Sequence, residues 1–75
     1  MGRFVVILVH STSRAIQVER LLKRAGLAVK LIPTPRHLSS DCGSAVRIAA
    51  TDRAPSEQLL NESRIPIERI EPLDD

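Results

Sequence analysis

The sequence predicts an α+β domain with a ferredoxin-like β-α-β-β-α-β split sandwich, in which two helices cover one face of a four-stranded antiparallel sheet. Short apolar runs rich in Val and Ile alternate with two amphipathic stretches in that order along the chain. Right-handed crossovers in the two βαβ halves favour this arrangement and give the strand order 4-1-3-2. The chain has 75 residues, so residues 1–75 are expected to form a single small domain.

The first strand and helix are predicted from the first third of the chain. An unbroken apolar run lies between Arg3 and His10, which is typical of a central strand. One of the hydroxyl residues 11–13 then serves as the N-cap of a helix, whose apolar residues form a stripe at helical spacing. Gly26 supplies the left-handed turn that ends this helix.

Two further strands flank a long loop. Residues 27–32 alternate around Lys30 and predict the second strand. Pro33 and Pro35 end this strand and favour an edge position in the sheet, because proline cannot donate a ladder hydrogen bond. Residues 45–50 form another short apolar run and predict the third strand.

The last third of the chain predicts a second, shorter helix and a final strand. Pro55 suits the first turn of the helix, with Asp52 as its cap. Three isoleucines in residues 65–70 mark the last strand, which Pro66 interrupts. The acidic residues 71–75 are predicted to be a frayed tail.

The apolar run of the first strand places side chains on both faces of the sheet, since successive residues of a strand point to opposite sides. Helices on one face leave the other face open. We therefore expect the open face to pack against another sheet, either on a partner protein or in a homodimer, with an edge strand as a second possible dimer contact.

The net charge of +2 conceals an asymmetry along the chain. Residues 1–36 contain seven basic residues and one acidic residue, whereas residues 37–75 contain four basic and eight acidic residues. This pattern indicates either a dipolar solvated surface or a basic face that attracts an anionic partner or substrate. Nucleic acid is not expected as a partner, because Phe4 is the only aromatic residue and offers no stacking platform.

The cysteine content and the hydropathy restrict the cellular setting. A single Cys excludes an intramolecular disulfide and a four-Cys zinc site, and a lone thiol suits a reducing compartment, so a cytoplasmic location is expected. No membrane contact is expected, because no apolar segment approaches the roughly 20 residues of a membrane span, and residues 4–9 are too short a run for a signal peptide. A chain of this size also argues against a self-contained enzyme, and no cofactor is expected.

The loop at residues 33–44 holds the only cysteine, Cys42, and is the predicted functional site. In the predicted topology, this loop lies at the same end of the sheet as the start of the first helix. Cys42 should therefore lie beside His10 and the free N–H groups of the helix N-terminus, which favour a thiolate. Arg36 approaches from the loop itself, and Gly43 permits unusual backbone angles that aim N–H groups at an anion.

Each of these residues also has a purely structural interpretation. A free Cys in a small domain is often an inert core side chain, and His10 and Arg36 are also compatible with ordinary surface positions. Ser11 and Thr12 are candidate helix caps and Ser39 a candidate turn residue, although all three are also candidate substrate ligands. No metal is expected, because the spacing of the His, Asp and Cys residues matches no standard ligand pattern. A Cys/His/Asp hydrolase would need a scaffold that forms a pocket.

The motif P-x-P-R-x-L-S-x-x-C-G at residues 33–43, with His-Ser-Thr at residues 10–12, resembles the selenium/sulfur carrier-like family of small proteins. The resemblance covers nearly the whole chain. It implies that Cys42 carries a sulfur or selenium atom and that Arg36 and Gly43 belong to its site.

Together, these features predict a carrier protein rather than a stand-alone enzyme. Cys42 would accept sulfur or selenium from a donor enzyme such as a cysteine desulfurase, hold it as a persulfide or selenopersulfide, and pass it to an acceptor protein. This hypothesis expects an accessible Cys42 within reach of Arg36 and the first helix, and burial among Leu and Ile side chains argues against it. Similar chains tend to carry a glycine before the last strand, whereas this chain has Ser-Arg at residues 63–64. This difference from the family concerns the predicted C-terminus of the second helix rather than the site.

Two alternatives belong to other functional classes. One is a non-catalytic interaction or regulatory domain, which binds through its open sheet face or an edge strand and in which Cys42 is incidental. The other is a small redox thiol protein, which would need a resolving Cys from a partner because this chain has a single cysteine.

Overall fold

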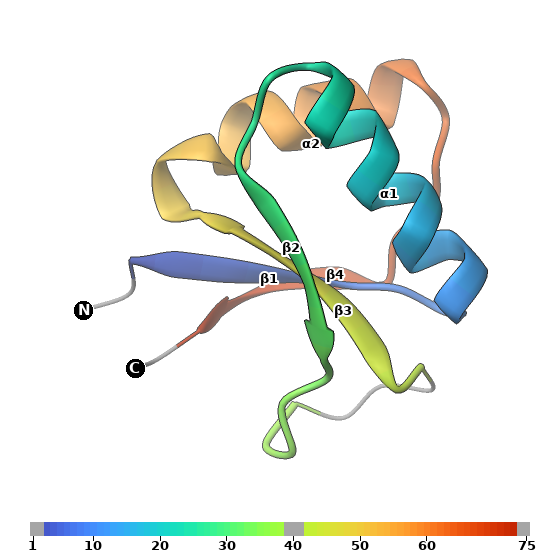
Figure 1. Cartoon of the computed structure of the whole chain (residues 1–75), viewed down its shortest axis with the longest axis vertical. Helices are drawn as coiled ribbons and strands as arrows, with labels where there is room; N and C mark the ends of the chain where they lie inside the picture. The colour runs from blue at the N-terminus through green and yellow to red at the C-terminus, as the bar shows by residue number, and fades with distance from the viewer. Residues whose placement is uncertain (1–2, 39–41, 74–75) are drawn as a thin grey trace.

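The computed structural model describes residues 3–38 and 42–73 and shows an antiparallel sheet with two helices on one of its faces (Figure 1). The strand order is β2-β3-β1-β4, and every neighbouring pair is antiparallel. This result confirms the predicted α+β fold, its strand order and the edge position of the second strand. The elements are β1 (Phe4–Leu8), α1 (Thr12–Arg24), β2 (Val29–Pro33), β3 (Ser44–Ala49), a 3₁₀ turn (Ala50–Asp52), α2 (Arg53–Glu62) and β4 (Arg69–Leu73).

The main core lies between the sheet and the two helices. In β1, Val5 and Ile7 belong to this layer, as do Ile48 and Val46, their partners in β3. Burial of each such side chain contributes roughly 1.5–3 kcal/mol relative to exposure, so this layer is the chief source of stability. Its buried members are Val5, Ile7, Val9, Ala15, Val18, Leu22, Cys42, Val46, Ile48 and Leu60.

Both ends of α1 follow from the local sequence. The Ser11 side chain accepts a hydrogen bond from the Arg14 N–H at 3.2 Å, which makes Ser11 the N-cap. After the helix, Gly26 adopts a φ of 86°, and the Leu27 N–H donates to the Leu22 carbonyl at 3.1 Å. This bond satisfies one of the carbonyls that a helix leaves free at its C-terminus. The predicted start and the predicted glycine stop are therefore confirmed.

The second helix ends in the same type of turn, but without a glycine. Arg64 adopts a φ of 55°, and the Ile65 N–H donates to the Leu60 carbonyl at 3.0 Å. The left-handed conformation costs a residue with a Cβ roughly 1–2 kcal/mol, so the departure noted at residues 63–64 carries an energetic penalty. At the other end, Asp52 occupies the predicted N-cap position, but its side chain makes no capping hydrogen bond.

The sheet face opposite the helices is not an exposed apolar surface. Val6, Leu8 and Ala45 point to this face and are fully buried. Leu38, from the loop after β2, packs against them, and Ile32 does the same from β2. Because these side chains are already covered within the chain, a second sheet is not needed to bury them, and packing of this face against a partner or a second copy stays a prediction.

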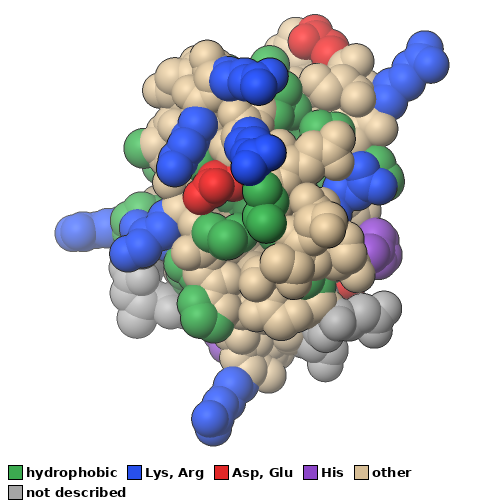
Figure 2. Space-filling view, turned by 45° about the vertical axis from the view of Figure 1, so that its right-hand side comes forward, with side chains coloured by type: hydrophobic (Ala, Val, Ile, Leu, Met, Phe, Trp, Pro, Cys, Tyr) green, Lys and Arg blue, Asp and Glu red, His purple; other side chains and the backbone are tan. Residues whose placement is uncertain are grey.

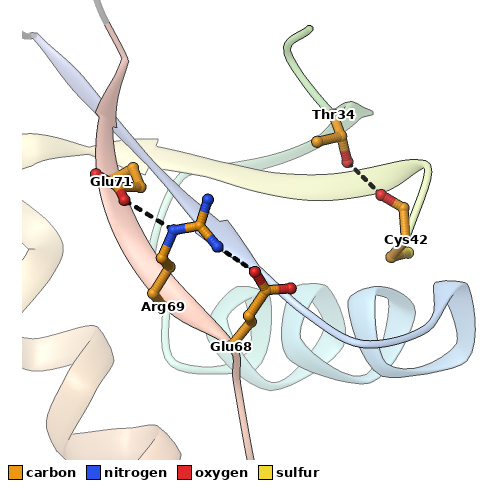
Figure 3. Close-up of polar contacts among 5 residues, drawn as sticks. All are labelled: Thr34, Cys42, Glu68, Arg69 and Glu71. Atoms are coloured by element: carbon orange, nitrogen blue, oxygen red, sulfur yellow. Dashed lines mark hydrogen bonds and ion pairs between the residues drawn. The ribbon is translucent and has the colours of Figure 1, made fainter. Parts of the chain in front are cut away.

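Charged side chains on the same face contribute to this cover. Arg69 lies opposite Leu8 in the register and forms ion pairs with Glu68 and, at 2.8 Å, with Glu71 (Figure 3). Arg47 lies over the Phe4 ring, 4.3 Å from the ring centroid. The aliphatic stems of such side chains cover apolar neighbours while the charged ends reach water.

The last strand begins and ends later than predicted. β4 runs from Arg69 to Leu73, so residues 71–73 are paired strand, and their prediction as a frayed tail is wrong. Residues 74 and 75 lie outside the described residues. The register with β1 places Ile70 opposite Ile7, on the helix side of the sheet.

The shift of β4 has a physical reason. Residues 65–68 form the connection from the end of α2 to the sheet, and Ile65 and Ile67 pack against the core there without joining the ladder. The acidic sequence predicted that Glu71 belongs to a solvated tail. In the structure, Glu71 forms an ion pair with Arg69 on the sheet face, which compensates its charge within the strand. Pro72 fits within the strand because β4 lies at the edge of the sheet.

Candidate functional site

The backbone of Cys42 is held where the loop after β2 enters β3. Thr34 Oγ1 donates a hydrogen bond to the Cys42 carbonyl at 2.7 Å, and the Thr34 N–H donates to the Gly43 carbonyl at 3.0 Å (Figure 3). Next to these bonds, Pro33 pairs with Ser44 in the sheet register. The stem of the loop is thus fixed from both sides, which sets the direction of the Cys42 side chain.

The Cys42 sulfur lies at the N-terminus of α1. Thr12 is the first residue of this helix, and its hydroxyl oxygen lies 3.7 Å from Sγ, within hydrogen-bond distance for sulfur. The Ser44 N–H donates to Sγ at 3.4 Å. The Thr12 hydroxyl and the Ser44 N–H are thus two polar groups that face the sulfur at this helix end. The expected juxtaposition of Cys42 with the start of the first helix is observed.

The thiol is almost completely covered. The reduced thiol of Cys42 is only 5% exposed, and Cys42 belongs to the same buried cluster as Val46 and Ile48. The expectation of an accessible thiol is therefore wrong for this conformation. The surroundings of the sulfur are nevertheless mixed, because the Thr12 hydroxyl and the Ser44 N–H face it. An inert core cysteine, which behaves as a small apolar side chain, needs neither of these contacts.

His10 and Arg36 are both exposed. His10 follows β1 directly before the cap of α1, and Arg36 occupies a turn that a 3.0 Å bond from the Leu38 N–H to the Pro35 carbonyl closes. Within the described part of the chain, no hydrogen bond joins either side chain to Cys42. Their participation in the site therefore stays a prediction.

Ser11 and Gly43 have clear local roles, and Ser39 lies outside the described residues. Ser11 uses its hydroxyl to cap α1. The expectation of an unusual backbone angle at Gly43 is wrong, because the positive φ among the described glycines belongs to Gly26. A Cβ at Gly43 would meet no atom within 4 Å. Glycine at this position therefore leaves open space beside Cys42 rather than relieving strain.

Two residues of the site were not predicted. Thr34 holds the Cys42 carbonyl, and Ser44 provides the N–H that faces the sulfur. A hydroxyl residue between two prolines at the base of the loop was the available signal for Thr34. The backbone donor at Ser44 depends on the register of β2 against β3, which the sequence pattern did not specify.

Neither a metal-binding cluster nor a membrane-spanning helix is found within residues 3–38 and 42–73. These residues include no group of three or more His, Cys, Asp or Glu side chains that could hold a metal ion. In the same ranges, no helix has the length and the apolar character needed to cross a membrane.

Comparison with protein families matches residues 4–72 to the family described as "Putative Se/S carrier protein-like". No curated protein and no solved structure matches the chain. The matched range runs from the start of β1 into β4 and contains Cys42 together with Thr12, Thr34 and Ser44, which contact it. Because this match covers far more than half of the sequence, the chain belongs to the selenium/sulfur carrier-like family.

Proposed function

We propose that this protein carries sulfur or selenium on Cys42 as a persulfide or selenopersulfide and transfers it between a donor and an acceptor protein. The observation that carries the proposal is the position of Cys42 Sγ between the Ser44 N–H and the Thr12 hydroxyl, at the N-terminus of α1. Both groups can donate a hydrogen bond to an anionic sulfur, and the helix terminus stabilises the same charge.

Loading of the carrier is a thiol–persulfide exchange. The Cys42 thiolate, after its proton has passed to water, attacks the outer sulfur of a persulfide on the donor protein. A new bond from Sγ to that sulfur forms as the donor's S–S bond breaks, and the donor departs as a thiolate. No net oxidation or reduction occurs. Unloading repeats the exchange with an acceptor thiolate, and a selenium atom follows the same steps.

The other predicted site residues would assist the transfer from positions around Cys42. Arg36 is exposed and is suited to meet the anionic sulfur of an incoming donor, and His10 and Ser11 are exposed polar residues just before α1. Ser39, outside the described residues, stays a predicted substrate ligand. Gly43 keeps space free for the donor beside Cys42. The side chains that cover the thiol must move aside during transfer, since Cys42 is only 5% exposed.

A carrier of this kind suits a reducing compartment, so we place it in the cytoplasm. A cysteine desulfurase that holds a cysteine-derived persulfide is the donor class that fits, and the acceptor is a protein with a reactive thiol or an activating site for sulfur or selenium. A homodimer, through the open sheet face or an edge strand, is not required to cover the apolar side chains of that face.

Intact-protein mass spectrometry after incubation with a cysteine desulfurase and L-cysteine tests the proposal. The expected result is an adduct of one sulfur atom that a thiol reductant removes. Because Cys42 is the only cysteine, the Cys42→Ala variant should acquire none. Thr12→Val should be loaded more slowly, and Ser13→Ala, at the next position of α1, should be loaded normally. Absence of the adduct, or its persistence in Cys42→Ala, would refute the carrier function.

A second candidate is an interaction domain in which Cys42 is a core residue. The observation that favours it is the 5% exposure of Cys42 and its place in the main buried cluster. Alkylation by iodoacetamide at neutral pH separates the two functions. A carrier thiol should react at least as fast as free cysteine once the loop opens, whereas a core thiol should react only at the rate of global unfolding.

A further inference from the structure

Helix α1 has a second stripe of side chains, which lies at the surface along the edge of the main core. These residues are three or four positions apart, so they share one side of the helix. Together with Ile65, which follows α2, they line a surface groove of about 310 Å³. The groove is lined by Ser13, Ile16, Gln17, Arg20, Leu21, Arg24 and Ile65.

The floor of this groove is apolar. Leu21 and Ile65 pack against the main core with one side and face the groove with the other. Ile16 is only half-buried and is not among the side chains packed against the core. Figure 2, turned toward the α1 side of the molecule, shows hydrophobic side chains gathered beside several Lys and Arg side chains. An apolar floor with a charged rim is typical of surfaces that bind another protein.

The rim is strongly basic. Arg20 and Arg24 are exposed, and neither forms an ion pair with any residue that the structure describes. Glu19, the acidic residue of α1, pairs with Lys23 at 3.7 Å and so does not neutralise them. None of the residues lining the groove, as the structure describes it, is acidic. The groove therefore combines uncompensated positive charge with apolar surface.

We propose that this groove docks an acidic amphipathic helix of a partner protein. Arg20 and Arg24 are four residues apart, which is a rise of about 6 Å along the helix axis. Carboxylates four residues apart on a second helix have the same spacing, and helices pack with the ridges of one in the grooves of the other. The guanidinium groups then bind those carboxylates, and an apolar side chain of the partner lies on Ile16 and Ile65.

This proposal goes beyond the carrier function and does not depend on chemistry at Cys42. It does place the partner close to the site. The groove begins at Ser13, the neighbour of Thr12, whose hydroxyl contacts the Cys42 sulfur. A partner helix docked along α1 would therefore have one end near the N-terminus of α1, the helix end that contacts the sulfur.

Fluorescence anisotropy with a synthetic peptide tests the docking. The probe is a labelled amphipathic helix of roughly 18 residues, long enough to be partly helical in water, with Leu on one face and Glu on both flanks. Binding is expected at low ionic strength and should weaken with added salt. The double variant Arg20→Glu/Arg24→Glu should bind about tenfold more weakly or worse, because Arg side chains are frequent anchors of interfaces.

A charge-matched control distinguishes docking from non-specific attraction. Arg3→Glu/Lys30→Glu changes the net charge by the same amount at exposed positions outside the groove, and it should bind like the wild type. Ile16→Gln leaves the charge unchanged and should weaken binding, since it removes one apolar side chain from the floor of the groove. All of the substituted residues are exposed or half-buried, so we expect the variants to fold like the wild type. Circular dichroism checks this.

Three outcomes would overturn the proposal. The first is equal loss of affinity in the control variant, which would mean that only net charge matters. The second is an absence of binding to wild-type protein at low salt. The third is tighter binding to phosphatidylglycerol vesicles or to single-stranded RNA that the Arg20→Glu/Arg24→Glu variant loses, which would assign the basic rim to a lipid or nucleic-acid surface instead.

Discussion

Replacement of Thr34 by valine isolates the hydrogen bond that holds the Cys42 backbone. The change keeps the shape of the side chain and removes the hydroxyl that donates to the Cys42 carbonyl at 2.7 Å. A partly buried hydrogen bond of this kind contributes about 1–2 kcal/mol when its loss leaves the acceptor without that donor. In a domain of this size each kcal/mol corresponds to a change in Tm of about 4–8 °C. We therefore expect Thr34→Val to lower the free energy of unfolding by about 1–2 kcal/mol.

The same change should alter the reactivity of the thiol. Cys42 is 5% exposed, so a reagent reaches it through local opening of the segment that Thr34 holds. A loss of about 1 kcal/mol in the free energy of that opening raises the open population roughly fivefold, and the alkylation rate should rise in proportion. Urea denaturation and iodoacetamide labelling measure the two effects. Thr34→Ser, which retains the hydroxyl, is the matched control and should change both far less.

Two results would refute this reasoning about Thr34. If Thr34→Val leaves both stability and the labelling rate unchanged, the hydrogen bond does not hold the loop stem. If Thr34→Ser, which keeps the hydroxyl, is as damaging as Thr34→Val, the effect is not specific to loss of the hydroxyl.

Three stability predictions follow from other positions, each measured by thermal and urea denaturation. Arg64→Gly should raise the free energy of unfolding by about 1 kcal/mol, because glycine adopts the left-handed φ of 55° without a Cβ penalty; a decrease would show that the Arg64 side chain is itself stabilising. Ser56→Ala should raise it by about 1 kcal/mol, because the Ser56 hydroxyl is fully buried and has no hydrogen-bond partner among the described residues, and a loss of stability would point to a bond formed in solution. Leu38→Ala should lower it by about 1–2 kcal/mol, because half-buried Leu38 covers the apolar cluster beneath the sheet, and an unchanged value would mean that this cover contributes little.

The fold was predictable because its local signals agree with one another. Apolar runs of strand length, a capping serine at residue 11 and a glycine stop at residue 26 each have one low-energy interpretation. The β4 boundary was not predictable from the same signals. Ile65 and Ile67 look like strand residues, yet they serve the core from a connecting segment, and the paired strand carries charges instead.

The open sheet face shows why composition alone misled. The apolar run of β1 correctly indicated apolar side chains on both faces. What hides Val6 and Leu8 is contributed from far along the chain, by Leu38 and by the stems of charged residues on β3 and β4. Long Arg side chains count as polar in a sequence pattern, although their stems are aliphatic and can cover apolar neighbours. The pattern therefore overestimated the exposed apolar area.

The site was predicted in position but not in detail. Topology alone places the end of the loop beside the start of the first helix, and Thr12 does lie against the Cys42 sulfur. The contribution of Ser44 depends on which residue of the loop enters β3 first, and that is a matter of register. The burial of the Cys42 thiol could not be predicted from the sequence pattern either, since polar neighbours in the sequence do not reveal whether the side chain turns inward.

Burial and polar contact at Cys42 are compatible with one carrier mechanism. A persulfide is an anion that benefits from N–H and hydroxyl donors, and it is also easily oxidised when water and oxidants reach it freely. A covered sulfur that faces the Ser44 N–H and the Thr12 hydroxyl meets both needs, provided that a partner opens the cover. The basic groove on α1 includes Ser13, the residue after Thr12, so a partner docked there would also lie near the helix end that contacts the sulfur. A docked partner would then be the agent that exposes Cys42, and transfer would be confined to proteins that fit the groove.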